Sequence, residues 1–80
     1  MVEIFYELEA RGSVSIAIYD ASRALVKQLA RNSDKEAGLN VEQWDGRNSD
    51  GLLVANGTYI CVIESSSGGQ SSIPILIQKR

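Results

Sequence analysis

Apolar and polar residues alternate with a period of two along the first part of the chain. From Val2 to Leu8 every second residue is apolar or aromatic, and the same rhythm returns from Ser13 to Asp20. This period is typical of strands that bury one face, so we predict two strands that pair as a hairpin across Arg11–Gly12. Residues 25–30 alternate less cleanly, which favours a third strand and leaves a short helix as the alternative.

The pattern stops between Arg31 and Gly38, where most residues are polar, charged or small, and we predict a surface loop there. Residues 39–44 are again typical of an extended segment. Within it, however, Leu39 and Val41 alternate in one phase and Trp44 in the other. One extra residue would reconcile the two phases, so we predict a β-bulge between Val41 and Trp44.

The segment from Trp44 to Cys61 organises the chain. It begins with the only tryptophan, continues through two glycine-containing turns and enters the most apolar strand, residues 58–64. We predict a short strand at Leu52–Ala55 and a tight hairpin turn at Asn56–Gly57, which would supply positive φ angles. Six residues of the segment are assigned a structural role: Trp44, Asp45, Gly46, Gly51, Gly57 and Tyr59.

Serine and glycine dominate residues 65–72, which we predict to be a flexible connection. Three isoleucines then alternate from Ile73 to Ile77. Pro74 lies inside this pattern, and a proline within a strand marks the edge of a sheet.

Six or seven short strands without a convincing helix predict an all-β fold. We predict one Ig-like or fibronectin-III-like antiparallel β-sandwich of about seven strands over residues 1–80, as a module of a larger protein. The residues expected to face the core are Ile4, Tyr6, Leu8, Val14, Ile16, Ile18, Val26, Leu29, Trp44, Val54, Tyr59, Cys61, Ile63, Ile75 and Ile77.

The composition excludes several function classes. Eight Lys and Arg against ten Asp and Glu give a formal charge of -2, spread without blocks. This balance argues against nucleic-acid binding and against a polybasic membrane patch. We expect no direct membrane insertion, because no apolar run is long enough, and any secretion signal would lie outside this fragment. The single cysteine cannot form an internal disulfide.

Candidate chemistry is sparse. Asp45, Asn48 and Asp50 resemble part of a calcium loop, but the ligand spacing is broken, so we predict hydrogen-bonded Asx turns instead. Cys61 has no histidine anywhere in the chain to activate it and is predicted to be a buried apolar side chain. We therefore expect no enzyme activity, no catalytic residues, no cofactor and no metal site.

Four apolar residues are expected to point outward: Phe5, Ile60, Val62 and Leu76. An exposed apolar patch on a small domain is typical of a docking site. Two interpretations stay open. Either these residues form a docking face for a neighbouring domain or partner, or a loop or the edge at Pro74 covers them.

Several motifs together resemble the FlgD-like Ig-like domain and the similar C-terminal sorting domain of type IX (Por) secretion. They are Ile18-Tyr19-Asp20, Ala37-Gly38, Trp44-Asp45-Gly46-Arg47, Gly51, Val54-Ala55 and Gly57-Thr58-Tyr59. The chain departs from the pattern at Glu42, where an apolar residue is usual. It departs again at Arg23, where the family has glycine, so this turn must hold Arg23 in a conformation that glycine takes cheaply, or change its type.

A tyrosine two residues before Cys61 also resembles the tyrosine corner of antibody-type domains, although the partner cysteine is missing. We expect Tyr59 to form a similar hydrogen bond.

The FlgD-like resemblance implies a non-catalytic accessory module, near the C-terminus of a secreted or cell-surface bacterial protein, with a structural, docking or type IX sorting role. The apolar strand and basic ending from Ile73 to Arg80 favour sorting. Implied partners are neighbouring domains of the parent protein and, for sorting, the secretion machinery. The alternative is an Ig-like scaffold domain of a flagellar hook-capping protein.

Overall fold

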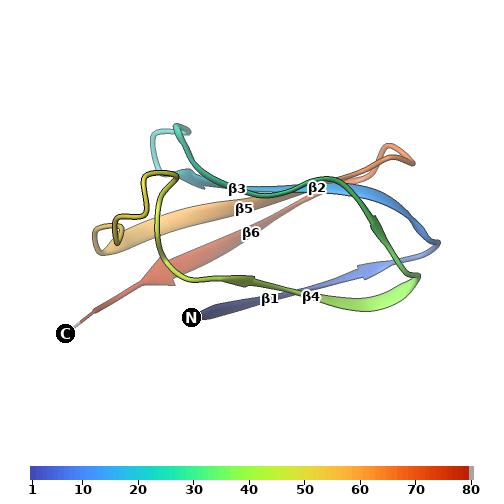
Figure 1. Cartoon of the computed structure of the whole chain (residues 1–80), viewed down its shortest axis with the longest axis horizontal. Coiled ribbons are helices and arrows are strands. Elements are labelled where there is room, and N and C mark those ends of the chain that lie inside the picture. Colours follow the sequence, from blue (N-terminus) through green and yellow to red (C-terminus); the bar gives the residue numbers. More distant parts are fainter. Residues whose placement is uncertain (80) are drawn as a thin grey trace.

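The computed structural model of the chain describes residues 1–79, in which six strands form two antiparallel sheets (Figure 1). A two-stranded sheet pairs β1 with β4, and the strand order of the four-stranded sheet is β3-β2-β5-β6. The predicted all-β Ig-like sandwich is confirmed, with a strand count slightly below the expected seven. No helix among these residues is long and apolar enough to cross a membrane. The strands are β1 (Val2–Leu8), β2 (Gly12–Asp20), β3 (Leu25–Lys35), β4 (Gly38–Trp44), β5 (Gly57–Ser65) and β6 (Gln70–Ile77).

The hairpin predicted for the first two strands is wrong, because β1 pairs with β4. Their antiparallel register runs from Val2 opposite Trp44 to Leu8 opposite Gly38. Residues 9–11 carry the chain from the small sheet to the large one, where β2 lies between β3 and β5 (Figure 1). Alternation shows which face of a strand is buried but not which strand lies beside it, so nearness in sequence indicated the wrong partner.

The core lies between the sheets and contains the residues that alternation assigned to it. Trp44 is 1% exposed, and Ile16, Ile18 and Cys61 are 0% exposed. Ala17 is also buried, although the period of two does not select it, because β2 has neighbours on both sides. The expected core residues that are buried are Ile4, Tyr6, Val14, Ile16, Ile18, Trp44, Val54, Tyr59, Cys61, Ile63 and Ile75, and those that pack partly buried against them are Leu8, Val26, Leu29 and Ile77.

Strand β3 continues to Lys35, so the surface loop predicted between Arg31 and Gly38 is wrong over most of its length. Its ladder with β2 shifts register: Val14 faces Ser33, whereas Ile16 faces Ala30. The irregularity includes Asn32, which has a φ of 49°. A bulge breaks the period of two, and an edge strand tolerates polar side chains on both faces. The sequence pattern therefore carried no signal for this extension.

Strand β4 pairs regularly with β1, and the bulge predicted between Val41 and Trp44 is wrong. Because Trp44 points into the core, every second residue before it in β4 also points inward. Leu39 and Val41 point outward and are 73% and 48% exposed, while Glu42 lies on the same side as Trp44. Burial of the large indole and a complete set of strand hydrogen bonds stabilise this register by more than the exposure of Leu39 and Val41 costs.

Residues 45–56 form an irregular loop. The strand predicted at Leu52–Ala55 is wrong, and an isolated bridge between Arg47 and Leu53 stands in its place. The tight hairpin predicted at Asn56–Gly57 is also wrong. The Asn56 amide instead pairs with the backbone of Lys79, whose N–H donates to Oδ1 at 2.9 Å and whose carbonyl accepts from Nδ2 at 3.2 Å. This side chain thus extends the ladder of β5 and β6 by one step.

The connection between β5 and β6 is shorter than the flexible segment predicted for residues 65–72, since β6 already begins at Gln70. The Ser65 N–H donates to the Gly69 carbonyl at 2.8 Å and closes the turn. Pro74 lies in β6, at the edge of the large sheet, as predicted. Arg80, the last residue of the basic ending, lies outside the described residues.

Candidate functional site

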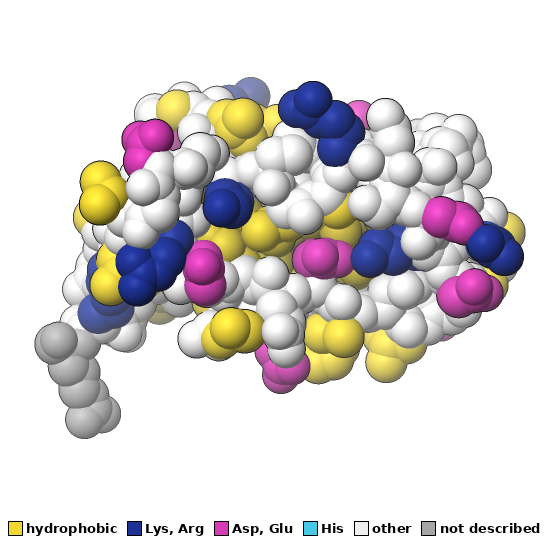
Figure 2. All heavy atoms as spheres, viewed as in Figure 1, with side chains coloured by type: hydrophobic (Ala, Val, Ile, Leu, Met, Phe, Trp, Pro, Cys, Tyr) yellow, Lys and Arg dark blue, Asp and Glu magenta, His cyan; other side chains and the backbone are white. Residues whose placement is uncertain are grey.

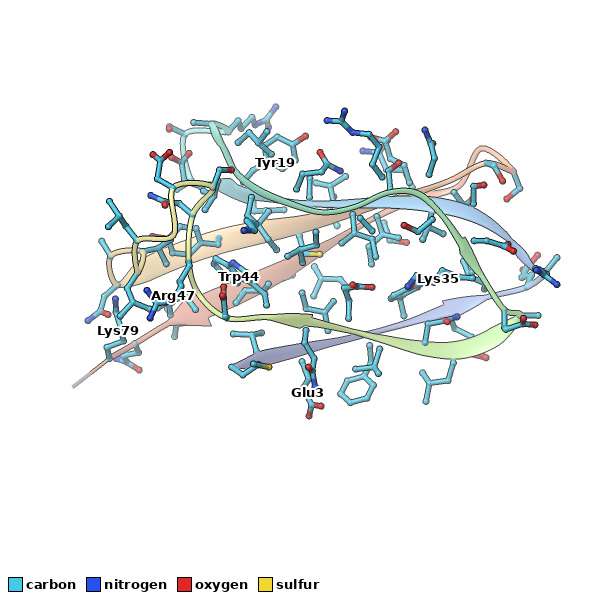
Figure 3. All side chains as sticks on the ribbon, in the orientation of Figure 1. Glu3, Tyr19, Lys35, Trp44, Arg47 and Lys79 are labelled. Atoms are coloured by element: carbon cyan, nitrogen blue, oxygen red, sulfur yellow. The ribbon has the colours of Figure 1, made fainter. Side chains whose placement is uncertain are left out.

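Two aromatic side chains of the core hold the loop of residues 45–56. The Trp44 indole N–H donates to the Arg47 carbonyl at 3.0 Å, and the Tyr59 hydroxyl donates to the Ala55 carbonyl at 2.7 Å. The two rings meet at an edge, with centroids 5.7 Å apart. Figure 3 shows Trp44 beside the loop that carries Arg47. The hydrogen bond expected for Tyr59 is therefore confirmed, and one aromatic pair anchors both ends of the loop.

Polar side chains of the same loop bond to its own backbone. Asp45 Oδ1 accepts from the Arg47 N–H at 3.0 Å. Asn48 Oδ1 accepts from the N–H groups of Asp50 and Leu52, each at 3.0 Å. The predicted Asx turns are confirmed, and they occupy side-chain oxygens that a calcium ion would need. Within residues 1–79 there is no cluster of three His, Cys, Asp or Glu residues that could hold a metal ion.

Glycine lets this loop reverse direction twice. Gly46 and Gly51 have φ angles of 76° and 81°, a region that costs a residue with a Cβ about 1 to 2 kcal/mol. Gly57 is the first residue of β5. Ser49 ties the loop to the large sheet, because its N–H donates to the Val26 carbonyl at 3.0 Å. Five of the six residues to which the sequence assigned a structural role therefore shape or anchor this loop: Trp44, Asp45, Gly46, Gly51 and Tyr59.

Cys61 is free and 0% exposed, at the centre of β5. Burial, with a smaller contribution from the Glu42 carboxylate, raises the pKa of this thiol to about 11. The thiol stays protonated at neutral pH, and a protonated thiol is a poor nucleophile. Cys61 thus behaves as a small apolar side chain.

The sequence reasoning missed a polar cluster inside the sandwich. The Glu42 side chain is 18% exposed, and its Oε2 lies 3.6 Å from Nζ of Lys35, which is within ion-pair range but too long for a hydrogen bond. Figure 3 shows Lys35 between β3 and β4. Burial, and then the Glu42 carboxylate, raise the pKa of Tyr6. The sequence did contain an indication of this cluster, because Glu42 is two residues from Trp44 and therefore lies on the same face of the strand.

The four residues expected to form one docking face lie on two surfaces. Phe5 is 56% exposed on the outer face of β1, and Leu76 is 67% exposed on the outer face of β6. Ile60 and Val62 are half-buried on the outer face of β5. Because the outer faces of two packed sheets point in opposite directions, Phe5 is separated from the other three. Ile60, Val62 and Leu76 share the outer face of the large sheet, where Leu76 lies opposite Thr58 and Val62 lies opposite Ser72.

Phe5 belongs instead to a patch on the small sheet. It lies opposite Val41, and Leu39 lies opposite Glu7. Glu3 and Glu7 flank Phe5 on the same face of β1. Figure 2 shows hydrophobic side chains along the side of the molecule formed by β1 and β4. The outer face of the small sheet thus combines exposed apolar side chains with carboxylates.

A groove of about 650 Å³ lies between residues 5–12 and the hairpin that joins β5 to β6. Its lining includes Val14 and Ile63, which are 1% and 5% exposed, and partly buried Ile73. Ser65, Ser66 and Ser67 also line the groove. The groove thus combines apolar side chains with serines and with the glutamates Glu7 and Glu9.

These features define an Ig-like β-sandwich module with an aromatic-anchored loop. The chain belongs to the FlgD Ig-like domain family, whose model matches residues 4–69. It is also similar to the crystal structure of FlgD from P. aeruginosa, with a TM-score of 0.74 and 24% sequence identity, over 90% of this chain and 60% of that chain. This similarity shows the fold alone. The chain spans about 60% of the length of the FlgD chain that it matches. No curated protein matches the sequence.

Proposed function

We propose that this chain is a non-catalytic Ig-like scaffold domain of a flagellar hook-capping protein of the FlgD type. The observation that supports the proposal is the family match over residues 4–69, which includes the complete loop between Trp44 and Tyr59. The proposal adopts the alternative function expected from the sequence. The comparisons favour it over an accessory module of a secreted or surface protein.

The geometry suits a scaffold. The side chains of Asp45 and Asn48 bond to the loop backbone, and the Cys61 thiol is buried and protonated. These side chains stabilise the fold and leave no activated group for a reaction. A module of this kind contributes rigid surfaces to its parent protein, so its partners are neighbouring domains and other proteins of the assembly.

The type IX sorting role remains a prediction based on the C-terminal residues. Fusing residues 1–80 to an inert periplasmic reporter in a host with type IX machinery tests it directly. Retention of the reporter in the periplasm would count against sorting and would leave the scaffold proposal intact.

The scaffold proposal is tested in the source bacterium by deleting the segment that encodes residues 1–80 and restoring the gene in variant forms. We expect the deletion, and a Trp44→Ala variant that loses the core indole, to abolish hooks in electron micrographs and swimming in soft agar. The control is Arg31→Ala, which removes an exposed side chain and should restore both. Normal hooks in the deletion strain would refute the proposal.

A further inference from the structure

The inner face of the small sheet carries two polar atoms that have no hydrogen-bond partner among the described residues. They are the hydroxyl oxygen of Tyr6 and Oε2 of Glu42, and both atoms are buried. Buried polar groups in folded proteins are almost always hydrogen-bonded, to protein groups or to ordered water, because burial takes away their bonds to solvent. These two groups therefore need a partner that residues 1–79 do not supply directly.

Tyr59 shows how a tyrosine of the same core is satisfied by the protein. Tyr6 and Tyr59 are both 8% exposed, but the Tyr59 hydroxyl donates to the Ala55 carbonyl at 2.7 Å. Equal burial thus goes with a bonded hydroxyl in one case and an unbonded one in the other. What the Tyr6 hydroxyl can bond depends on the polar groups around it.

Strand register brings Tyr6 and Glu42 together. Tyr6 lies opposite Asn40, and Glu42 lies opposite Ile4, so Tyr6 and Glu42 are diagonal neighbours on one face of the small sheet. Such neighbours are about 7 to 8 Å apart at the backbone and within reach of aromatic and long side chains. The Glu42 carboxylate contributes, after burial, to the raised pKa of Tyr6, as expected when the two groups face each other.

Lys35 approaches the same carboxylate from the large sheet. Its Nζ lies 3.6 Å from Oε2 of Glu42, which is too long for a direct hydrogen bond. A single water molecule, however, can contact two atoms at this separation at about 2.8 to 3.0 Å from each. Figure 3 shows Lys35 between β3 and β4, so the three groups meet where the two sheets come together.

We propose that Tyr6, Lys35 and Glu42 bind one ordered water molecule, which links the two sheets from inside the sandwich. The water oxygen accepts hydrogen bonds from the Tyr6 hydroxyl and the Lys35 ammonium, and the water donates one hydrogen to Oε2 of Glu42. Buried waters make about three hydrogen bonds, so these partners suffice. The inference goes beyond the scaffold role, because it assigns a binding site and its ligand.

The chemistry of the three groups selects water over an ion. A cation would be repelled by the Lys35 ammonium, and an anion would be repelled by the Glu42 carboxylate. The charges of these two groups balance each other, so the site as a whole calls for a neutral ligand. Two donors and one acceptor converge on it, and water can accept from both donors while it donates to the acceptor.

A crystal structure of the 80-residue chain, at a resolution that shows ordered solvent, tests the proposal. We expect one water within about 3.2 Å of Tyr6 Oη, Lys35 Nζ and Glu42 Oε2. In crystals of Tyr6→Phe, this water should be lost or should move away from the ring. The matched control is Tyr59→Phe, which removes a hydroxyl that already has a protein partner and should leave the water in place.

A double-mutant comparison tests the same site in solution. The changes in urea midpoint caused by Tyr6→Phe and Lys35→Met should not add in the double variant, because both residues bond one water. The changes caused by Tyr59→Phe and Lys35→Met should add, since Tyr59 bonds Ala55 instead. Circular dichroism melting checks that each variant folds.

Several results would overturn the proposal. In the native crystal structure, these are a direct bond of the Tyr6 hydroxyl to Glu42 or to a backbone carbonyl, an ion in the site, or no solvent peak between the three groups. A water that keeps its position in Tyr6→Phe would show that the hydroxyl does not hold it. Additive midpoint changes for Tyr6→Phe and Lys35→Met would reject the shared water in solution.

Discussion

The ring of Trp44 meets the ring of Tyr59 edge to face, at a centroid distance of 5.7 Å and an interplanar angle of 65°. Each ring also uses its one polar atom to bond a carbonyl of the same loop, at Arg47 and at Ala55. The pair therefore joins the end of β4 to the start of β5 across the sandwich. Loss of either ring should weaken both the core and the loop.

Trp44→Ala should lower the free energy of unfolding by about 3 to 5 kcal/mol, because a large side chain that is 1% exposed is removed from the core. A domain of this size is stable by roughly 4 to 12 kcal/mol, so the variant should be close to unfolded. Urea titration followed by circular dichroism measures the loss. Leu39→Ala, at a position that is 73% exposed in the same strand, should change stability by less than about 0.5 kcal/mol.

Tyr59→Phe removes a single hydroxyl and leaves the Ala55 carbonyl without its donor. We expect a loss of about 1 kcal/mol, the usual net value of such a bond. Amide hydrogen exchange should also rise in residues 47–55, since one anchor of the loop is gone. Tyr19→Phe is the matched control, because no hydrogen bond of the Tyr19 hydroxyl occurs within the described residues. Equal losses in both variants would show that the Ala55 bond contributes nothing.

Short-range patterns predicted the core and the loop chemistry of this chain. The period of two placed Ile16, Ile18 and Cys61 inside correctly, because burial of one strand face depends on the strand alone. The Asx turns at Asp45 and Asn48 were predictable for a similar reason, since each side chain bonds backbone groups only a few residues away. Trp44 was also expected in the core, although alternation left the phase of its strand ambiguous.

Relationships between distant segments were not predictable in this way. The pairing of β1 with β4, the extension of β3 past Arg31 and the inward position of Glu42 all depend on which strand lies beside which. Asn56 shows the same limit on a smaller scale. Its partner, the Lys79 backbone, lies 23 residues away, whereas the Asn-Gly pair by itself is typical of a local turn.

Arg23 has a φ of 70°, so the turn between β2 and β3 holds a non-glycine residue in the left-handed region, as the comparison with the glycine of related domains suggested. Arg23→Gly should raise the free energy of unfolding by roughly 0.5 to 1 kcal/mol, since relief of the backbone strain exceeds the extra entropy of the unfolded chain. The control is Ala21→Gly in the same turn, where φ is not positive and the substitution should destabilise. Urea midpoints of the two variants should move in opposite directions.

The carboxyl group of Asp20 should make the free energy of unfolding depend on pH. Hydrogen bonds from the Ser22 hydroxyl and then from the Ala24 N–H lower the pKa of this carboxyl. A pKa that is lower in the folded state means that the carboxylate stabilises the fold above its unfolded pKa of about 3.9, and that this contribution disappears as pH falls through the folded value.

The stability advantage of the native chain over Asp20→Asn should therefore be full at pH 7 and shrink below about pH 4. Urea midpoints measured from pH 7 to pH 2 give this difference directly. Asp50→Asn, which removes an exposed carboxylate, is the comparison for the loss of one negative charge from the surface. A difference for Asp20→Asn that is independent of pH would contradict the assignment.

The partly buried pair of Lys35 and Glu42 should contribute more to protecting the edge of β4 from pairing than to the stability of the fold. The two side chains are 28% and 18% exposed and 3.6 Å apart at their charged atoms. Replacing such a pair by apolar residues of similar volume is often neutral or stabilising by about 1 to 4 kcal/mol. The double variant Lys35→Met, Glu42→Leu should therefore unfold at an equal or higher urea concentration.

The same double variant removes the inward charge that protects the edge of β4. Light scattering coupled to size-exclusion chromatography should then detect a larger share of dimers or larger species than for the native chain at the same concentration. The control Lys27→Met removes a lysine from β3 and leaves the β4 edge unchanged. If the double variant is monomeric and clearly less stable than the native chain, the pair serves stability and the protective role of Glu42 is wrong.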